Sequence, residues 1–174
     1  MLHPLRLYTD GSLMENRVGC AVVSRTSSES VRLPNNTSIF RAELHAVMLA
    51  MRLIRKRKEK NFIIFSDSLS SLQALNGFKL KLDLIQKILK DFSNLTTIGK
   101  TVMLCWIPSH VNILGNENAD LAAKSTLSLL ITNMRFPAYD LAPHVSKFCS
   151  KEWHDIWDDC QGNKLYAIYP NVGD

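Results

Sequence analysis

Four acidic residues of this chain lie within or beside segments whose apolar pattern predicts burial: Asp10, Glu43, Asp67 and Asp120. Carboxylates are almost never fully buried in proteins unless they are paired with a cation or bind a metal ion. The fold must therefore bring these side chains to cations, or to one another around a bound ion. This requirement constrains the fold more than any other feature of the sequence.

The size and composition of the chain suit one compact domain with a short addition, since it has 174 residues of which 46% are hydrophobic. Its four cysteines form no C-x-x-C pair, which argues against a zinc ribbon or a redox motif. The sequence contains neither a secretory signal nor an apolar run of about 18 residues. We therefore expect a soluble monomer with no membrane association, located inside the cell in the nucleus or the cytoplasm.

Positive charge is concentrated in the first part of the chain. Residues 1–130 contain 17 Lys and Arg against 10 Asp and Glu, a net charge of +7, whereas residues 131–174 contain 4 against 6, a net charge of −2. A basic domain favours a polyanionic partner such as nucleic acid. The basic run from Arg52 to Lys60 fits either a solvated helix end or a surface that contacts phosphates.

Apolar periodicity and turn residues divide residues 1–130 into alternating strands and helices, with Asp10-Gly11 expected to break the chain. The order βββ-α-β-αα-β-α predicts an α/β fold with a mixed sheet and helices on both faces, in which the first three strands form an antiparallel meander. The expected strands cover residues 5–10, 18–24, 30–33, 61–65 and 101–107, and the expected helices cover residues 39–57, 68–75, 80–95 and 117–130.

Glu43 lies on the apolar side of the first expected helix. At about 100° per residue its side chain falls between those of Ala50 and Ile54. A lone carboxylate is unfavourable in such a position, so Glu43 is the acid least easily explained as a surface residue.

Asp10 and Asp67 each end an expected strand, and ligand sites in α/β sheets lie at strand ends. Glu43 and Asp120 could approach the same point from flanking helices. Four carboxylates this close stay ionised only if cations neutralise them, and oxygen ligands favour Mg²⁺ or Mn²⁺. Two such ions about 3.5–4 Å apart suit phosphodiester cleavage. Taken singly, Asp10 also fits an ordinary turn, Asp67 a helix N-cap, and Asp120 the surface of a helix.

His110 lies in a Pro-Ser-His loop, ten positions before Asp120. A histidine beside a metal site can carry protons at neutral pH, so His110 is a candidate for proton transfer. A histidine in a loop is otherwise often incidental, and the spacing to Asp120 favours the functional interpretation.

Residues 131–174 differ from the first part and are expected to form a helix followed by an extended segment. Pro137 and Pro143 are expected to break the chain. An apolar helical face then follows, and we favour a structural role for it, although its tryptophans could also stack on bases. Residues 165–170 are expected to be a strand or an extended tail. The apolar face consists of Val145, Phe148, Trp153, Ile156, Trp157 and Cys160.

Four short motifs occur in one order over about residues 1–130: Tyr8-Thr9-Asp10-Gly11-Ser12, Phe40-Arg41-Ala42-Glu43-Leu44, Ser66-Asp67-Ser68, and Trp106-Ile107-Pro108-Ser109-His110 continuing to Gly115-Asn116-Glu117-Asn118-Ala119-Asp120. Together these motifs resemble those of type 1 ribonuclease H domains. The resemblance is greatest to the domains that follow a reverse transcriptase in non-LTR retrotransposon polyproteins. It implies a mixed five-stranded sheet of three antiparallel and then two parallel strands.

The resemblance also implies an activity and the residues responsible for it. The activity is endonucleolytic hydrolysis of the RNA strand of RNA–DNA hybrids, with two Mg²⁺ or Mn²⁺ ions bound by catalytic carboxylates. His110 would assist proton transfer or product release, and shape and 2′-hydroxyl groups would select RNA. The implied metal ligands are Asp10, Glu43, Asp67 and Asp120, and the implied substrate-binding residues are Gly11, Ser12 and Asn116.

Two departures from the family pattern affect the expected grip on the substrate. Ile39 and Phe40 stand where many members have an asparagine pair that contacts the hybrid, and the segment around residues 78–81 is too short for the basic protrusion of some members. We therefore expect weak hybrid binding without a neighbouring reverse transcriptase. Because Met1 lies a few residues before the first strand, we expect that polymerase to be absent from this chain.

Two other hypotheses remain open. A nuclease or transposase of the same fold would act on DNA, but the sequence Gly115-Asn116-Glu117 before Asp120 argues against it. A degenerate fragment of a retrotransposon would bind nucleic acid or a protein partner without cleaving. The presence of all four acids disfavours this second alternative.

Overall fold

The computed structural model describes residues 3–77, 82–134 and 138–168 of the chain. The chain divides into two compact units, Met1–Met134 and Arg135–Asp174, and each unit is described by itself. The expectations for residues 78–81, for Pro137 and for the end of the 165–170 segment lie outside the described residues. Among the helices of the described ranges, none is long and apolar enough to span a membrane.

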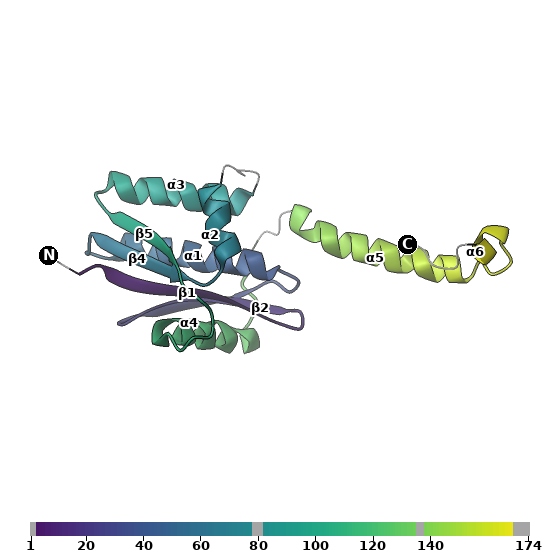
Figure 1. Ribbon diagram of the computed structural model, residues 1–174, viewed down its shortest axis with the longest axis horizontal. Helices are drawn as coiled ribbons and strands as arrows, with labels where there is room; N and C mark the ends of the chain where they lie inside the picture. Colours follow the sequence, from purple (N-terminus) through teal and green to yellow (C-terminus); the bar gives the residue numbers. More distant parts are fainter. Residues whose placement is uncertain (1–2, 78–81, 135–137, 169–174) are drawn as a thin grey trace. The chain divides into compact units, whose positions relative to one another are not determined.

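The first unit contains a mixed five-stranded sheet with the strand order β3-β2-β1-β4-β5 (Figure 1). Strands β1 (Leu5–Met14), β2 (Arg17–Ser24) and β3 (Ser28–Leu33) form antiparallel pairs. Strand β4 (Asn61–Ser66) lies parallel to β1 on one side and to β5 (Thr101–Trp106) on the other. The predicted α/β fold, with three antiparallel strands followed by two parallel strands, is therefore confirmed.

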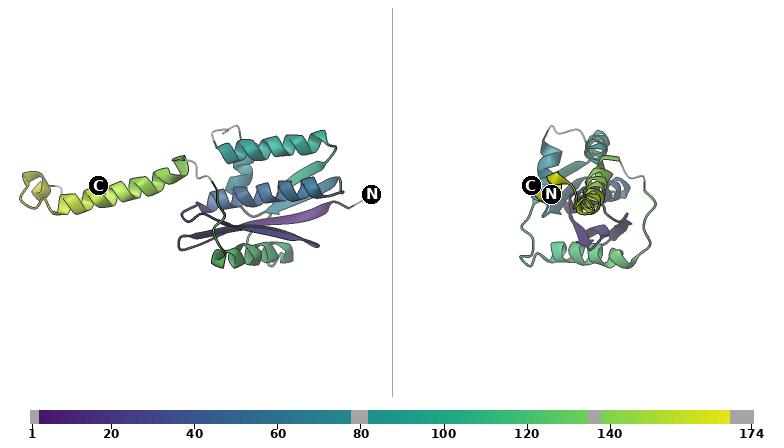
Figure 2. Two further views of the ribbon diagram at one scale, coloured as in Figure 1. Left: turned by 180° about the vertical axis from the view of Figure 1, so that it is seen from behind. Right: turned by 90° about the vertical axis from the view of Figure 1, so that its right-hand side faces the viewer.

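Helices cover both faces of this sheet. Figures 1 and 2 show α1 (Ile39–Lys56), α2 (Leu69–Asn76) and α3 (Asp83–Thr97) on one face and α4 (Leu114–Ser125) on the other. Helix α1 contacts the sheet on one side and α3 on the other, and a helix enclosed in this way is apolar around most of its circumference. Its buried residues are ten apolar ones and three polar or charged ones, Arg41, Glu43 and His45.

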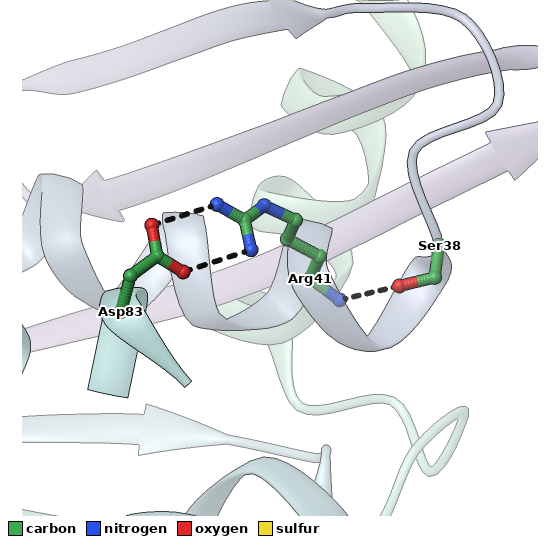
Figure 3. A network of polar contacts seen from close by, with 3 residues as sticks. All are labelled: Ser38, Arg41 and Asp83. Carbon is green, nitrogen blue, oxygen red and sulfur yellow. Dashed lines mark hydrogen bonds and ion pairs between the residues drawn. The ribbon is translucent and has the colours of Figure 1, made fainter. Parts of the chain in front are cut away.

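The first turn of α1 is fixed by polar contacts as well as by packing (Figure 3). Ser38 is the N-cap residue, and its hydroxyl accepts a hydrogen bond of 3.2 Å from the backbone N–H of Arg41. The buried guanidinium of Arg41 donates two hydrogen bonds of 3.3 Å to the carboxylate of Asp83, the first residue of α3. The N-terminal turns of α1 and α3 are thereby joined, and on α1 this contact lies two residues before Glu43.

Small residues allow α4 to lie close to the sheet. Ala119 and Ala123 are fully buried, and a Cβ added to Gly19 of β2 would lie 2.7 Å from the carbonyl oxygen of Ala123. The helix begins at Leu114, earlier than the expected start at residue 117, and is followed by a 3-10 turn, η1 (Thr126–Ser128).

The expected chain break at Asp10-Gly11 is wrong. Strand β1 continues to Met14 because residues 10–14 pair with β2, from Asp10 opposite Ala21 to Met14 opposite Arg17. The turn of this hairpin falls instead at Glu15, whose φ is +55°. The parallel pairing of β1 with β4 nevertheless stops at Thr9, so Asp10 is the first residue beyond it.

The second unit consists of helices α5 (Ala138–Asp158) and α6 (Lys164–Ile168). Pro143 lies within α5, so the expected break there is wrong: the helix continues past the proline at the cost of the backbone hydrogen bond that its nitrogen cannot donate. The expectation of a strand or an extended tail is wrong as far as Ile168, because residues 164–168 form α6. At the start of this helix, the side-chain oxygen of Asn163 accepts a hydrogen bond of 2.9 Å from the N–H of Leu165. What the apolar face of α5 packs against remains a prediction.

Candidate metal centre

Three of the four predicted acids converge where the parallel pairing of β1 and β4 ends. Thr9 and Ser66 are the last paired residues, so Asp10 and Asp67 follow on neighbouring strands. Glu43 reaches the same point from the second turn of α1. One carboxylate oxygen of each of the three lies within 4.8 Å of the others.

Gly11 allows α1 to come this close to β1. A Cβ at position 11 would lie 3.0 Å from the backbone nitrogen of Glu43 and 3.1 Å from the Cβ of Ala42, so a larger residue would displace the helix. The backbone N–H of Gly11 also donates a hydrogen bond to the Glu43 carboxylate. The glycine is therefore required by close packing against the helix and not by a turn.

Asp67 is held by hydrogen bonds from two other elements. The side-chain Nδ2 of Asn116, a buried residue of α4, donates to Oδ2 of Asp67 over 3.0 Å. The indole Nε1 of Trp106, the last residue of β5, donates to the backbone carbonyl oxygen of Asp67 over 3.1 Å. The N-cap of α2 is Ser68, so the alternative role of Asp67 as a helix cap is not observed.

Asp120 lines the same cavity but is not part of the close group of three acids. Its Oδ2 accepts a hydrogen bond of 2.6 Å from the ammonium nitrogen of Lys124, one turn further along α4. The fourth acid is thus at the site and paired with a cation of this chain.

The acids open into a cavity of about 310 Å³ at the end of the sheet. Gly11 and His110 line this cavity, and His110 is an exposed residue with a φ of +55° in the loop between β5 and α4. Ser12 and Asn116, the other expected substrate contacts, are buried and do not line it. The lining residues are Asp10, Gly11, Ile39, Phe40, Glu43, Asp67, Ser68, Ser70, Ser109, His110 and Asp120.

Burial and mutual repulsion make two of the acids weak. Burial raises the pKa of Glu43 to about 9, with Asp10 and Asp67 adding to the effect and the Gly11 hydrogen bond opposing it. Burial also raises the pKa of Asp10 to about 7, where Asp67 and Asp120 add to the effect and Lys124 opposes it. Without a metal ion, Glu43 and in part Asp10 therefore retain a proton near neutral pH.

The residues present fit a hard divalent cation. Glu43 is 7% exposed, and its Oε2 is buried without a hydrogen-bond partner. A buried carboxylate oxygen in this state is unfavourable unless an ion satisfies it. Because the three converging side chains offer only oxygen ligands, Mg²⁺ or Mn²⁺ is the type of ion that suits them.

Two contributors to the site had no predicted role. Lys124 stands four residues after Asp120, a spacing that brings opposite charges together on a helix and that could have been recognised in the sequence. Trp106 belongs to a quoted motif, but no sequence signal indicates that its N–H binds the backbone of Asp67.

Comparison with known proteins adds independent information about the first unit. A sequence profile of the RNase H family matches residues 3–128, the region that holds all four acids and His110. Ribonuclease H1 of Mus musculus and that of Rattus norvegicus are each 27% identical to the chain over 139 residues, and Ribonuclease H1 of Homo sapiens is 26% identical. These alignments cover 68% of this chain and 48% of each relative, so the chain spans about half the length of the curated relatives that it matches.

Proposed function

The chain belongs to the RNase H family, and on this premise we propose that residues 1–130 form a catalytic domain that hydrolyses the RNA strand of RNA–DNA hybrids. The observation that carries the proposal is the convergence of Asp10, Glu43 and Asp67 within 4.8 Å in a cavity of the matched region. The unpartnered Oε2 of Glu43 supports a cation at this point. The name and sequence of the matched ribonucleases support the choice of substrate.

In this proposal, Asp10, Glu43, Asp67 and Asp120 hold two Mg²⁺ or Mn²⁺ ions. Such ions, when bound, supply Lewis-acid chemistry for phosphodiester hydrolysis, namely activation of the attacking water and stabilisation of the leaving oxygen. The four acids line one cavity, as this arrangement requires.

The other residues of the site orient the acids and handle protons. Asn116 and Trp106 fix Asp67 from two sides, and the N–H of Gly11 fixes Glu43, so the carboxylates are held ready for binding. His110 is exposed at the edge of the cavity, where its imidazole carries a proton to the leaving oxygen or assists product release.

The substrate is proposed to contact the open side of the cavity. Gly11, Ser12 and Asn116 are assigned to the substrate by the family resemblance, although the latter two act from buried positions beside the acids. RNA is proposed to be selected by helix shape and 2′-hydroxyl groups, as the family resemblance implies. A reverse transcriptase of retrotransposon origin is the proposed partner, and the nucleus or the cytoplasm the proposed location, because RNA–DNA hybrids arise where RNA is copied.

A set of labelled duplexes of one sequence tests this proposal. The purified protein with Mg²⁺ or Mn²⁺ is expected to cut internally the RNA strand of the hybrid and to leave double-stranded DNA, double-stranded RNA and single-stranded RNA intact. A chelator of divalent ions is expected to stop the reaction. Cleavage of double-stranded DNA in place of the hybrid contradicts the proposal and favours a transposase-like nuclease.

A second candidate function is binding without cleavage. Ile39 and Phe40 line the cavity and present apolar side chains beside the acids, where many family members have an asparagine pair that contacts the hybrid. The alternative is therefore a retrotransposon-derived fragment that binds nucleic acid or a protein partner without cleaving. Hybrid binding without detectable RNA cleavage, in either metal, would favour it over the ribonuclease.

A further inference from the structure

The ion pair between Lys124 and Asp120 separates the fourth acid from the other three. Asp120 and Lys124 lie one turn apart on α4, and their Oδ2 and Nζ atoms are 2.6 Å apart. The remaining acids approach one another within 4.8 Å without Asp120. Among the described residues, Asp10, Glu43 and Asp67 take part in no ion pair.

We propose that Lys124 is a positioning residue that holds the Asp120 carboxylate in the metal-free protein and competes with a divalent cation for it. This inference rests on the proposed function, because it assumes that the four acids bind cations. It assigns the two cation positions unequal affinities. The position formed by Asp10, Glu43 and Asp67 is filled without breaking an ion pair, whereas the position that includes Asp120 is filled only when Lys124 gives up its carboxylate.

The exposure of the pair makes this exchange feasible. The Lys124 side chain is 48% exposed and that of Asp120 is 18% exposed, so the ammonium group can move into water when it is displaced. An exposed ion pair between neighbouring turns of a helix is weak, since solvent and salt screen it. A doubly charged ion at the carboxylate gains more than the ammonium group loses, and the competition therefore lowers the affinity without preventing binding.

Lys124 also acts on the rest of the site. Its ammonium group places a positive charge beside Asp120, which lines the same cavity as the other three acids. Removing its charge increases the negative potential at the position that includes Asp120. One charge near the protein surface, a few ångström from a divalent ion, changes the affinity for that ion by about 3- to 10-fold.

The test is a Mn²⁺ titration of the full, metal-free chain without nucleic acid, with free Mn²⁺ measured by electron paramagnetic resonance. Lys124→Met keeps most of the length of the side chain and removes the charge, whereas Lys124→Arg keeps the charge and is expected to keep the ion pair. Lys90→Met is the matched control, because Lys90 is an exposed lysine of α3 that forms no ion pair in the described structure.

Lys124→Met is expected to tighten the weaker Mn²⁺ site by about 3- to 10-fold, or to make it measurable, and to change the affinity of the tighter site less. Lys124→Arg and Lys90→Met are expected to behave as the wild type, and adding Asp120→Asn to Lys124→Met is expected to abolish the gain. Unchanged or weaker binding in Lys124→Met overturns this inference alone. An absence of Mn²⁺ binding in all variants overturns it together with the proposed function.

Discussion

Asn116 donates a hydrogen bond from Nδ2 to Oδ2 of Asp67 over 3.0 Å, and so connects helix α4 to the residue that follows strand β4. The two residues are 49 positions apart in the sequence. Asn116 is 4% exposed, and its Oδ1 has no hydrogen-bond partner. The contact fixes one oxygen of Asp67 and leaves the other free to bind a cation.

Asn116→Ala is expected to weaken Mn²⁺ binding by about 10-fold, because a ligand that loses its supporting hydrogen bond is no longer held in the binding orientation. Hybrid cleavage at low metal concentration is expected to fall with it. The control is Asn118→Ala, an exposed asparagine of the same helix. Equal metal affinity in the two variants would show that Asp67 does not depend on Asn116.

Gly11→Ala is expected to lower the free energy of unfolding by about 1–3 kcal/mol, because the added methyl group overlaps the backbone of α1 beside Glu43. Metal affinity is expected to fall as well, since the displaced helix carries a ligand. Chemical denaturation and Mn²⁺ titration measure the two effects. Gly162→Ala is the control, as a Cβ there meets no atom within 4 Å. A stable Gly11→Ala variant with normal metal affinity would contradict the close-packing argument.

Asp83→Ala is expected to destabilise the protein by about 1–3 kcal/mol, because it leaves the buried guanidinium of Arg41 without its carboxylate partner. The range lies below that of a fully buried pair because the Asp83 side chain is 56% exposed. Thermal unfolding measures the effect. Asp91→Ala on the same helix removes a carboxylate that makes no ion pair in the described structure, and it is expected to be nearly neutral. A similar loss in both variants would show that the pair with Arg41 contributes nothing particular.

The stability of the metal-free protein is expected to decrease as the pH rises. Glu43 has a pKa of about 9 against an ordinary 4.5, and Asp10 one of about 7 against 3.8. For each group, between its ordinary pKa and its pKa in the folded protein, the folded state binds more protons than the unfolded chain. Raising the pH in that range therefore lowers the free energy of unfolding, by up to about 1.4 kcal/mol per pH unit and group. The stabilisation is fully present below the ordinary pKa values of 3.8 and 4.5, and it is lost by about pH 7 for Asp10 and by about pH 9 for Glu43.

Denaturation in the presence of a chelator, at pH 6 and at pH 8.5, checks this expectation. Glu43→Gln removes the larger of the two effects and is expected to make the stability less dependent on pH in this range. Saturating Mn²⁺ is expected to restore stability at the higher pH, because the ion replaces the protons as the neutralising charge. A metal-free wild type that is equally stable at both values would contradict the assigned burial of Glu43.

Much of the fold is readable from the sequence because periodicity and breakers are local signals. The predicted helix over residues 39–57 agrees with α1, and its apolar phase placed Glu43 on the buried side. The order of strands and helices was correct throughout the first unit. The error at Asp10-Gly11 arose because this dipeptide usually turns the chain, whereas here pairing with β2 and contact with α1 keep it extended.

The contacts of the site were less predictable because they join distant elements. The bonds of Asp67 to Asn116 and Trp106 depend on how α4 and β5 are placed beside β4, which no local pattern encodes. The four predicted acids line one cavity, but the sequence does not distinguish the three that cluster from Asp120, which is paired with Lys124. The roles of His110 and of Ser12 remain predictions.

The central claim is that these carboxylates bind the cations that drive hydrolysis, and Asp67→Asn tests it most directly. The substitution keeps the shape of the side chain and its place beside Asn116, while it removes the charge that binds the cation. The measurement is the rate of RNA cleavage in a labelled RNA–DNA hybrid with Mg²⁺ or Mn²⁺, with Asp91→Asn as the control for loss of a carboxylate elsewhere. The account predicts a loss of at least about 100-fold for Asp67→Asn and a normal rate for the control. Equal cleavage by Asp67→Asn and the wild type would contradict it.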